Sequence, residues 1–204
     1  MKNDKIIDLF LELGKLRDVK RFTRYHPIFK ENVAEHTFHM AVIADRLVCE
    51  LGLNDLDYRK VMQLVFYHDV CELGMGEDYD GMTADNNPDY KKRKEHDENA
   101  TIDRLAKKHG KFIKELYQEY KDQKTEESKF VKALDKLQCT IHESDKSVGF
   151  AQSTPEQREY AVIWAIKHIE NFPKLKPLYR TAQERIKKIY TENKWHWSDD
   201  WFIK

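Results

Sequence analysis

A histidine and an aspartate stand side by side in the otherwise apolar run VFYHDVC, residues 65–71. The helical spacing of the apolar residues before this pair predicts that the run lies in a core helix. Burial of a charged side chain costs free energy unless the charge is paired or binds a metal ion. His68 and Asp69 therefore need partners from elsewhere in the chain, and the fold has to bring those partners to them.

The composition limits what the chain can be. Its 204 residues suit one domain, and 40% of them are hydrophobic while 35% are charged. The 36 basic and 36 acidic residues cancel, which argues against a general binder of nucleic-acid polymers or of membrane surfaces. No apolar run approaches the roughly 18 residues of a membrane span, and the charged N-terminus lacks an apolar signal core.

The cysteines point to a reducing compartment. They are odd in number and widely spaced, and no CxxC motif occurs, which argues against both a disulfide framework and a zinc–thiolate site. We therefore expect a cytoplasmic protein. The three residues are Cys49, Cys71 and Cys139.

Helical periodicity recurs along the chain, and no segment gives the alternating pattern of a strand. Asn32 and Glu35 form a capping-box pattern ahead of a helix over 33–51 that we expect to be largely buried. A long Gly- and Asp-rich loop is expected over 74–90. The pattern predicts an all-α fold, a bundle of about seven helices in a single domain that spans residues 1–204.

Three of the predicted helices carry ionisable side chains where core residues are expected. His36 lies in the helix over 33–51, the His68–Asp69 pair near the end of a helix over 55–73, and Asp135 in a helix over 125–143. Two imidazoles and two carboxylates suit a divalent transition metal such as Mn, Co, Ni, Fe or Zn. Successive side chains on a helix point about 100° apart. His68 and Asp69 can therefore share one ion only if the ion lies near a helix end or between the directions of the two side chains.

Glu72 follows His68 by four residues and Asp69 by three, which places it on the same helix face as the pair. A carboxylate there is placed to hold or deprotonate a metal-bound water rather than to add a further ligand.

The motifs VAEH at 33–36, YHD at 67–69 and KALDK at 132–136 resemble the H…HD…D signature of the HD-domain metal-dependent phosphohydrolases. Among them the chain is most similar to the 5′-deoxynucleotidases, which strip phosphate from deoxynucleoside monophosphates. The resemblance covers about residues 6–145. We expect the C-terminal helices over 155–192 and the aromatic tail after them to pack on this core.

The resemblance implies a role for each matching residue. The residues His36, His68, Asp69 and Asp135 match the ligands of one divalent transition metal. Glu72 matches the acid that positions the attacking water. The resemblance also implies a nucleotide substrate and a homodimer.

The substrate contacts that the resemblance implies lie in two loops. Arg21 matches a phosphate-binding arginine, and Phe22 stands where the family often has a tryptophan against the sugar. Phe22 lacks the indole N–H, so selectivity for deoxyribose stays open. The acid that binds the sugar 3′-hydroxyl matches Glu77 or Asp78, and the sequence leaves both open.

Other functions use the same motifs. A triphosphohydrolase acting on dNTPs would use basic residues such as 91–94 to reach the distal phosphates. A nucleotide sensor on this fold would lack catalysis, although the complete ligand set and Glu72 argue against it. An iron oxygenase needs a second metal, for which His96 and His109 are the available ligands. His39, one turn after His36, is expected to have a supporting role.

Overall fold

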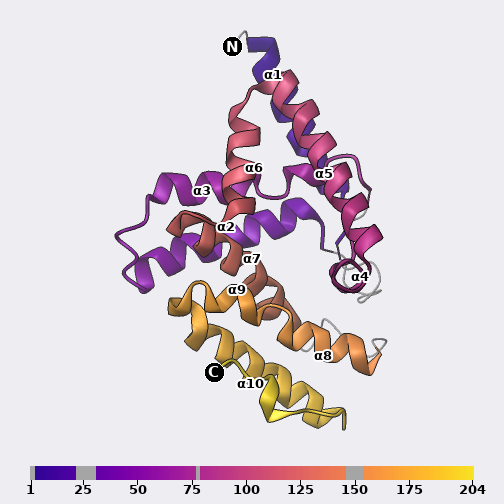
Figure 1. Ribbon diagram of the computed structural model, residues 1–204. Helices are drawn as coiled ribbons and strands as arrows, with labels where there is room; N and C mark the ends of the chain where they lie inside the picture. Colours follow the sequence, from indigo (N-terminus) through magenta and orange to yellow (C-terminus); the bar gives the residue numbers. More distant parts are fainter. Residues whose placement is uncertain (1–2, 22–30, 77–78, 146–153) are drawn as a thin grey trace.

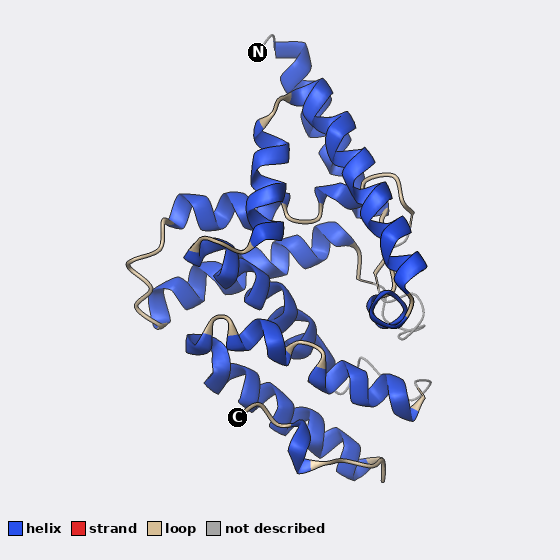
Figure 2. Ribbon diagram, in the orientation of Figure 1, coloured by secondary structure: helices blue, strands red, loops and turns tan. Residues whose placement is uncertain are grey.

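The computed structural model describes residues 3–21, 31–76, 79–145 and 154–204. Within these ranges the chain is helices and connections, and its only β pairing is an isolated antiparallel bridge between Lys20 and Asn32 (Figure 2). The predicted all-α fold is confirmed. The α-helices are α1 (Asn3–Leu13), α2 (Val33–Glu50), α3 (Tyr58–Tyr67), α4 (Gly81–Asn86), α5 (Pro88–His109), α6 (Phe112–Asp122), α7 (Glu126–Glu143), α8 (Pro155–Ile163), α9 (Ile166–Glu170) and α10 (Lys176–Glu192). The short 3-10 helices are η1 (Gly14–Asp18), η2 (Val70–Glu72), η5 (Pro173–Leu175) and η6 (Asp199–Trp201).

The helices are more divided than their periodicity predicts. The expected helix over 155–171 is interrupted between α8 and α9. Helix α4 lies inside the expected loop, where the side chain of Asp80 caps it by accepting from the backbone N–H of Thr83 at 2.6 Å. The helix predicted over 55–73 is wrong at its end, because α3 stops at Tyr67 and η2 follows.

Helices α2, α3 and α7 occupy the middle of the molecule (Figure 1). Helices α1, α5 and α6 lie at one end, and α8 and α10 lie at the other. Helix α7 packs against α2, α3 and α6 on one side and against α9 and α10 on the other. A single long helix therefore connects the two ends, and it carries one of the predicted metal ligands.

Two apolar clusters meet at the central helices. The larger one includes Val65 of α3 and Leu134 of α7, and the smaller one includes Val33 of α2 and Val70 of η2. All four of these side chains are fully buried. Each is within three residues of a predicted metal ligand, so packing in both clusters fixes the backbone around the site.

Helix α2 is less buried than its apolar content predicts. Met40 and Ala44 are fully buried, but Phe38 is 72% exposed and Val42 is 52% exposed. Apolar side chains therefore also occupy the solvent face of this helix.

The aromatic tail packs on α10. The ring of Tyr190 makes edge contacts with Trp195, Trp197 and Trp201, at centroid distances from 5.5 to 6.4 Å. Gln183 of α10 holds the same segment through its carbonyl oxygen, which accepts from the backbone N–H of Ile203 at 2.9 Å. The assignment of the whole chain to one domain stays a prediction.

Across the described ranges, no helix combines the length and the apolar composition needed to cross a membrane.

Glu12 joins α1 to α5. Its carboxylate accepts from Lys108 Nζ and from His109 Nε2, each at 2.7 Å, and also from Arg104. Burial by itself raises the pKa of Glu12, but these donors outweigh burial and lower the pKa from 4.5 to about 2. Since Arg104 and Lys108 are 50% and 52% exposed, solvent weakens their share of the attraction.

We predict that Glu12→Gln lowers the free energy of unfolding at pH 7 by about 1–2 kcal/mol. The folded-state pKa is below the unfolded one, so this contribution is complete above pH 4.5 and is lost as the pH falls toward 2. Urea unfolding of both proteins between pH 7 and pH 3 measures the difference, which should shrink below about pH 4.5.

Asp8→Asn is the matched control, because Asp8 is an exposed acid on the same helix. Its effect should stay within about 0.5 kcal/mol at every pH. A Glu12→Gln difference that does not depend on pH would contradict the assignment.

Candidate metal centre

The start of α2 fixes His36. The side chain of Asn32 accepts from the backbone N–H of Glu35 at 2.9 Å, and the Glu35 carboxylate accepts from the backbone N–H of Asn32 at 3.0 Å. This is the predicted capping box, and it orders the first turn of the helix. His36 follows at once and is fully buried. Its Nδ1 lies 2.7 Å from Oε1 of Gln138.

The end of α3 fixes His68 and Asp69. His68 is the last residue with helical backbone angles, and its Nδ1–H donates to the carbonyl oxygen of Val65 at 2.8 Å. This hydrogen bond satisfies a carbonyl that the helix end leaves open. At Asp69 the chain leaves the helix with φ −106° and ψ 13°, and Asp69 Oδ2 comes 3.0 Å from His68 Nε2. The helix end that a shared ion would need is therefore present.

Asp135 comes from the middle of α7 and is 3% exposed. Its Oδ2 accepts from the hydroxyl of Tyr120 at 2.6 Å and from Lys136 Nζ at 2.8 Å. Its Oδ1 lies 3.4 Å from His36 Nε2. One oxygen is thus held by neighbours and the other faces the histidines.

Three of the predicted ligands form a compact group. The Nε2 atoms of His36 and His68 are 3.3 Å apart, and one ligand atom each from His36, His68 and Asp69 all lie within 4.8 Å of one another. Asp135 is not in that group, and it adjoins it through His36. The structure therefore brings the four predicted residues together, with Asp135 slightly further out.

The donor set fits a divalent transition metal. Both Nδ1–H groups are used by protein acceptors, so two neutral imidazoles direct their Nε2 lone pairs at each other across 3.3 Å. That arrangement is unfavourable unless a cation, either a proton or a metal ion, lies between them. Two imidazole nitrogens and two carboxylates are ligands that such metals accept.

The pKa shifts of the two histidines and of Asp69 agree with one proton in the space between the two Nε2 atoms. Burial, followed by the charge of Arg21, lowers the pKa of His36 to about 4. Burial also disfavours charge on His68, but Asp69 and Asp135 outweigh it and raise the pKa of His68. Burial opposes ionisation of Asp69 as well, yet His68 and Arg21 hold its pKa below the ordinary range. A metal ion that binds here displaces a proton from His68.

Arg21 lies in the same cluster. The short pairing of residues 19–21 with 31–33 carries it there, through a backbone hydrogen bond from Arg21 N–H to the carbonyl of Glu31 at 2.8 Å. Its guanidinium is 3.2 Å from Asp69 Oδ2 and 3.3 Å from Glu31 Oε2. The arginine predicted to bind phosphate is therefore buried beside a predicted metal ligand.

The charges around the site nearly cancel before an ion binds. Two carboxylates, Glu31 and Asp69, contact Arg21, while the third, Asp135, contacts Lys136 and lies 3.8 Å from Lys132. Each of these three acids thus faces a basic side chain, and the buried Glu72 adds one further carboxylate to the region. A divalent ion makes this region positive, which favours an anion such as phosphate.

The remaining predicted residues divide into two groups. Glu72 is 5% exposed and lies on η2, directly after the histidine–aspartate pair. Because η2 is a 3-10 turn, the prediction that Glu72 continues the α-helical face of His68 is wrong. Phe22, Glu77 and Asp78 lie outside the described residues.

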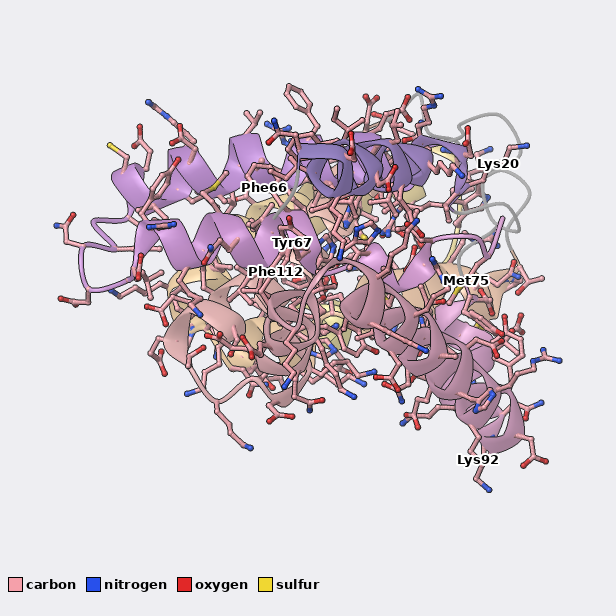
Figure 3. The ribbon with its side chains drawn as sticks, turned by 90° about the horizontal axis from the view of Figure 1, so that it is seen from above. Lys20, Phe66, Tyr67, Met75, Lys92 and Phe112 are labelled. Atoms are coloured by element: carbon pink, nitrogen blue, oxygen red, sulfur yellow. The ribbon has the colours of Figure 1, made fainter. Side chains whose placement is uncertain are left out.

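The residues named for other functions lie away from the cluster or have partners. Lys92 is 78% exposed and points outward from α5 (Figure 3). Lys94 lies 3.6 Å from Glu98. His96 is exposed, and His109 bonds to Glu12. A second metal site between the histidine–aspartate pair and Asp135 gains no support.

Sequence reasoning missed several groups around the ligands. Gln138 follows Asp135 by three residues on α7, a spacing that predicts the same helix face. Glu31 and Tyr120 gave no signal, because they reach the site only through tertiary contacts. Lys136 was adjacent to Asp135 in the sequence, but nothing there showed that its ammonium turns back to the carboxylate.

A family model described as HD domain matches residues 13–174 of the chain. Curated proteins named 5′-deoxynucleotidase HDDC2 are similar in sequence. The one from Mus musculus is 34% identical over 146 residues, which is 67% of this chain and 67% of that protein. The one from Dictyostelium discoideum is 28% identical over 145 residues, covering 66% of this chain and 74% of that protein.

A solved structure shares the fold. It is a predicted metal-dependent phosphohydrolase from Magnetospirillum magnetotacticum MS-1, with a TM-score of 0.67 and 23% identity over 94% of each chain. At this identity the likeness supports the fold alone.

We predict that a divalent transition metal stabilises the protein. At about 100 times its dissociation constant, Co²⁺ should add about 2.7 kcal/mol to the free energy of unfolding. For a chain of this length that corresponds to a Tm increase of roughly 5–10 °C. Differential scanning calorimetry with and without Co²⁺ measures it.

Asp69→Ala should remove most of this increase, because it deletes one of the grouped ligand atoms. Glu12→Gln, at the C-terminal end of α1 and outside the metal centre, should keep the Co²⁺-induced increase in Tm. An equal increase in Asp69→Ala would place the ion elsewhere.

Proposed function

The chain belongs to the HD domain family, and from that premise we propose that it removes the 5′-phosphate from nucleoside monophosphates, with deoxynucleotides as the expected substrates. The observation that carries the proposal is the convergence of His36, His68 and Asp69 beside the buried guanidinium of Arg21. Ligands for a Lewis acid and a cation for phosphate are what metal-assisted hydrolysis of a phosphomonoester needs. The relatives named 5′-deoxynucleotidase support the same substrate class.

In this proposal His36, His68, Asp69 and Asp135 hold one divalent ion, such as Mn, Co, Ni, Fe or Zn. When bound, the ion supplies Lewis-acid activation of water and of a phosphate oxygen. The buried hydrogen bonds at both Nδ1 atoms support this, because they leave both Nε2 atoms for the ion.

Glu72 and Arg21 carry the remaining chemistry. Glu72 accepts the proton of the attacking water, and its burial on η2 supports a fixed position for the carboxylate. Arg21 neutralises charge on the phosphate through its guanidinium. Attack in line at phosphorus then releases a nucleoside and inorganic phosphate.

The sugar contacts follow from the family pattern. We propose that Phe22 packs against the sugar and that Glu77 or Asp78 accepts from its 3′-hydroxyl. Phe22 directly follows Arg21 in the sequence, and Glu77 directly follows Gly76. A backbone hydrogen bond from Lys20 N–H to the carbonyl of Gly76, at 3.1 Å, holds these two described parts of the chain together.

Cellular location and assembly complete the proposal. We infer a reducing compartment, the cytoplasm, because Cys49, Cys71 and Cys139 are all unpaired thiols. We also infer a homodimer. The exposed apolar side chains of α1 and α2 support it, since their burial in an interface between two copies would be favourable. They are Ile7, Phe10, Leu11, Phe38 and Val42.

We predict that the Co²⁺- or Mn²⁺-loaded protein releases inorganic phosphate from a panel of nucleoside monophosphates. Glu72→Gln should lower kcat by about 100- to 10,000-fold, because it removes the proton acceptor. Its Co²⁺-induced rise in Tm should remain. Phosphate release and Tm are measured on the same samples, with Asp69→Ala as the metal-free reference.

The identity of the product separates this function from its alternative. Release of triphosphate from a dNTP, without phosphate release from any monophosphate, would replace the proposed activity with a triphosphohydrolase. Equal phosphate release by wild type and Asp69→Ala would contradict metal dependence.

We predict a solution mass of twice the 24.5 kDa chain by light scattering at micromolar concentration. Phe38→Glu places a charge on the exposed face of α2 and should shift the protein toward the monomer. The Tm of the monomer should not be lower in this variant than in wild type. A single-chain mass for wild type at tens of micromolar would contradict the dimer.

A further inference from the structure

Gln138 touches two parts of the site at once. It lies on α7 and is fully buried. Its Oε1 lies 2.7 Å from His36 Nδ1, and its Nε2 lies 2.8 Å from Glu31 Oε1 and 3.1 Å from His39 Nδ1. Each polar atom of this amide therefore has a partner.

The partners determine which way the amide points. The amide nitrogen of Gln138 faces Glu31 Oε1 at 2.8 Å, and the Arg21 guanidinium lies 3.3 Å from the other oxygen of the same carboxyl group. The amide nitrogen donates and the Glu31 oxygen accepts. The other end is then the carbonyl oxygen, and a carbonyl oxygen accepts only.

The orientation of the amide in turn determines the tautomer of His36. The Nδ1 atom that faces the carbonyl has to carry hydrogen. A neutral His36 then has its lone pair on Nε2, the atom that lies 3.3 Å from His68 Nε2 and 3.4 Å from Asp135 Oδ1. In the opposite tautomer an N–H would point into the metal centre.

We propose that Gln138 is a positioning residue that fixes the tautomer and the ring orientation of His36 for metal binding. Glu31 and His39 hold the amide, and the amide holds the imidazole. The inference deepens the proposed metal centre and requires that the protein bind a metal, but it does not require any particular substrate. Loss of such an outer hydrogen bond typically weakens metal binding about 10- to 100-fold.

Gln138→Met tests this, because methionine has similar length and no amide. Its Co²⁺ dissociation constant, measured by isothermal titration calorimetry, should increase about 10- to 100-fold. Imidazole nitrogen NMR of the metal-free protein supplies a second measurement. The His36 signals should report Nδ1–H in wild type and should lose that preference in Gln138→Met.

Gln183→Met is the matched control. Gln183 is also fully buried on a helix, and its amide bonds to the carbonyls of Val162 and Trp201 and to the N–H of Ile203. Loss of the Gln183 amide should lower Tm, as loss of the Gln138 amide should. It should leave the Co²⁺ dissociation constant within about threefold of wild type. This variant therefore separates positioning of a ligand from general stability.

Gln138→Glu combined with Glu31→Gln is the rescue variant, and it also covers the case in which Gln138→Met does not fold. The exchange lets a carboxylate at 138 accept from Nδ1–H of His36, while the amide at 31 supplies the donor between the two side chains. Co²⁺ binding by the folded double variant should stay within about threefold of wild type, and a tenfold loss would overturn the inference.

The other outcomes are equally decisive. Unchanged Co²⁺ binding in Gln138→Met, or an equal loss in Gln183→Met, would overturn the role of Gln138. Absence of Co²⁺ binding in wild type would instead contradict the proposed metal centre, so the two failures are distinguishable.

Discussion

Two buried imidazole nitrogens held 3.3 Å apart are the interaction on which the arrangement of this protein depends. Each ring donates its other N–H to a protein acceptor, so both lone pairs point at the same space. Only a cation makes that geometry favourable. The three central helices, α2, α3 and α7, have to hold the donors in place, and apolar clusters on either side supply the rigidity.

Buried charges around this space are paired rather than isolated. Arg21 bridges Glu31 and Asp69, and Lys136 holds Asp135. Removal of one member of such a pair leaves a buried charge without compensation, which is costly. The pairing thus lets the fold tolerate carboxylates in its core. It also keeps the local charge close to zero, so that a divalent ion turns the region into an anion site.

Patterns in the sequence identified the four candidate ligand residues. His36, His68, Asp69 and Asp135 interrupt apolar helical patterns, and a charged residue in such a place needs an explanation. The capping box before His36 was local and was predicted correctly. The end of α3 was placed too late, because a histidine side chain that caps a carbonyl leaves no mark in hydrophobic periodicity. Burial on α2 was overestimated for Phe38, because periodicity does not show which apolar residues face solvent.

The sequence by itself determined the all-α class and the capped start of α2, since both depend on residues close together in the chain. It also named the four candidate ligand residues, whereas their convergence was an expectation that came from the family resemblance. Only the tertiary structure decided that Arg21 pairs with Asp69, that Tyr120 holds Asp135 and that Gln138 orients His36. These contacts join residues 15 to 102 positions apart. Their partners are selected by packing of whole helices, and no local pattern encodes the distance between two side chains that meet only after folding.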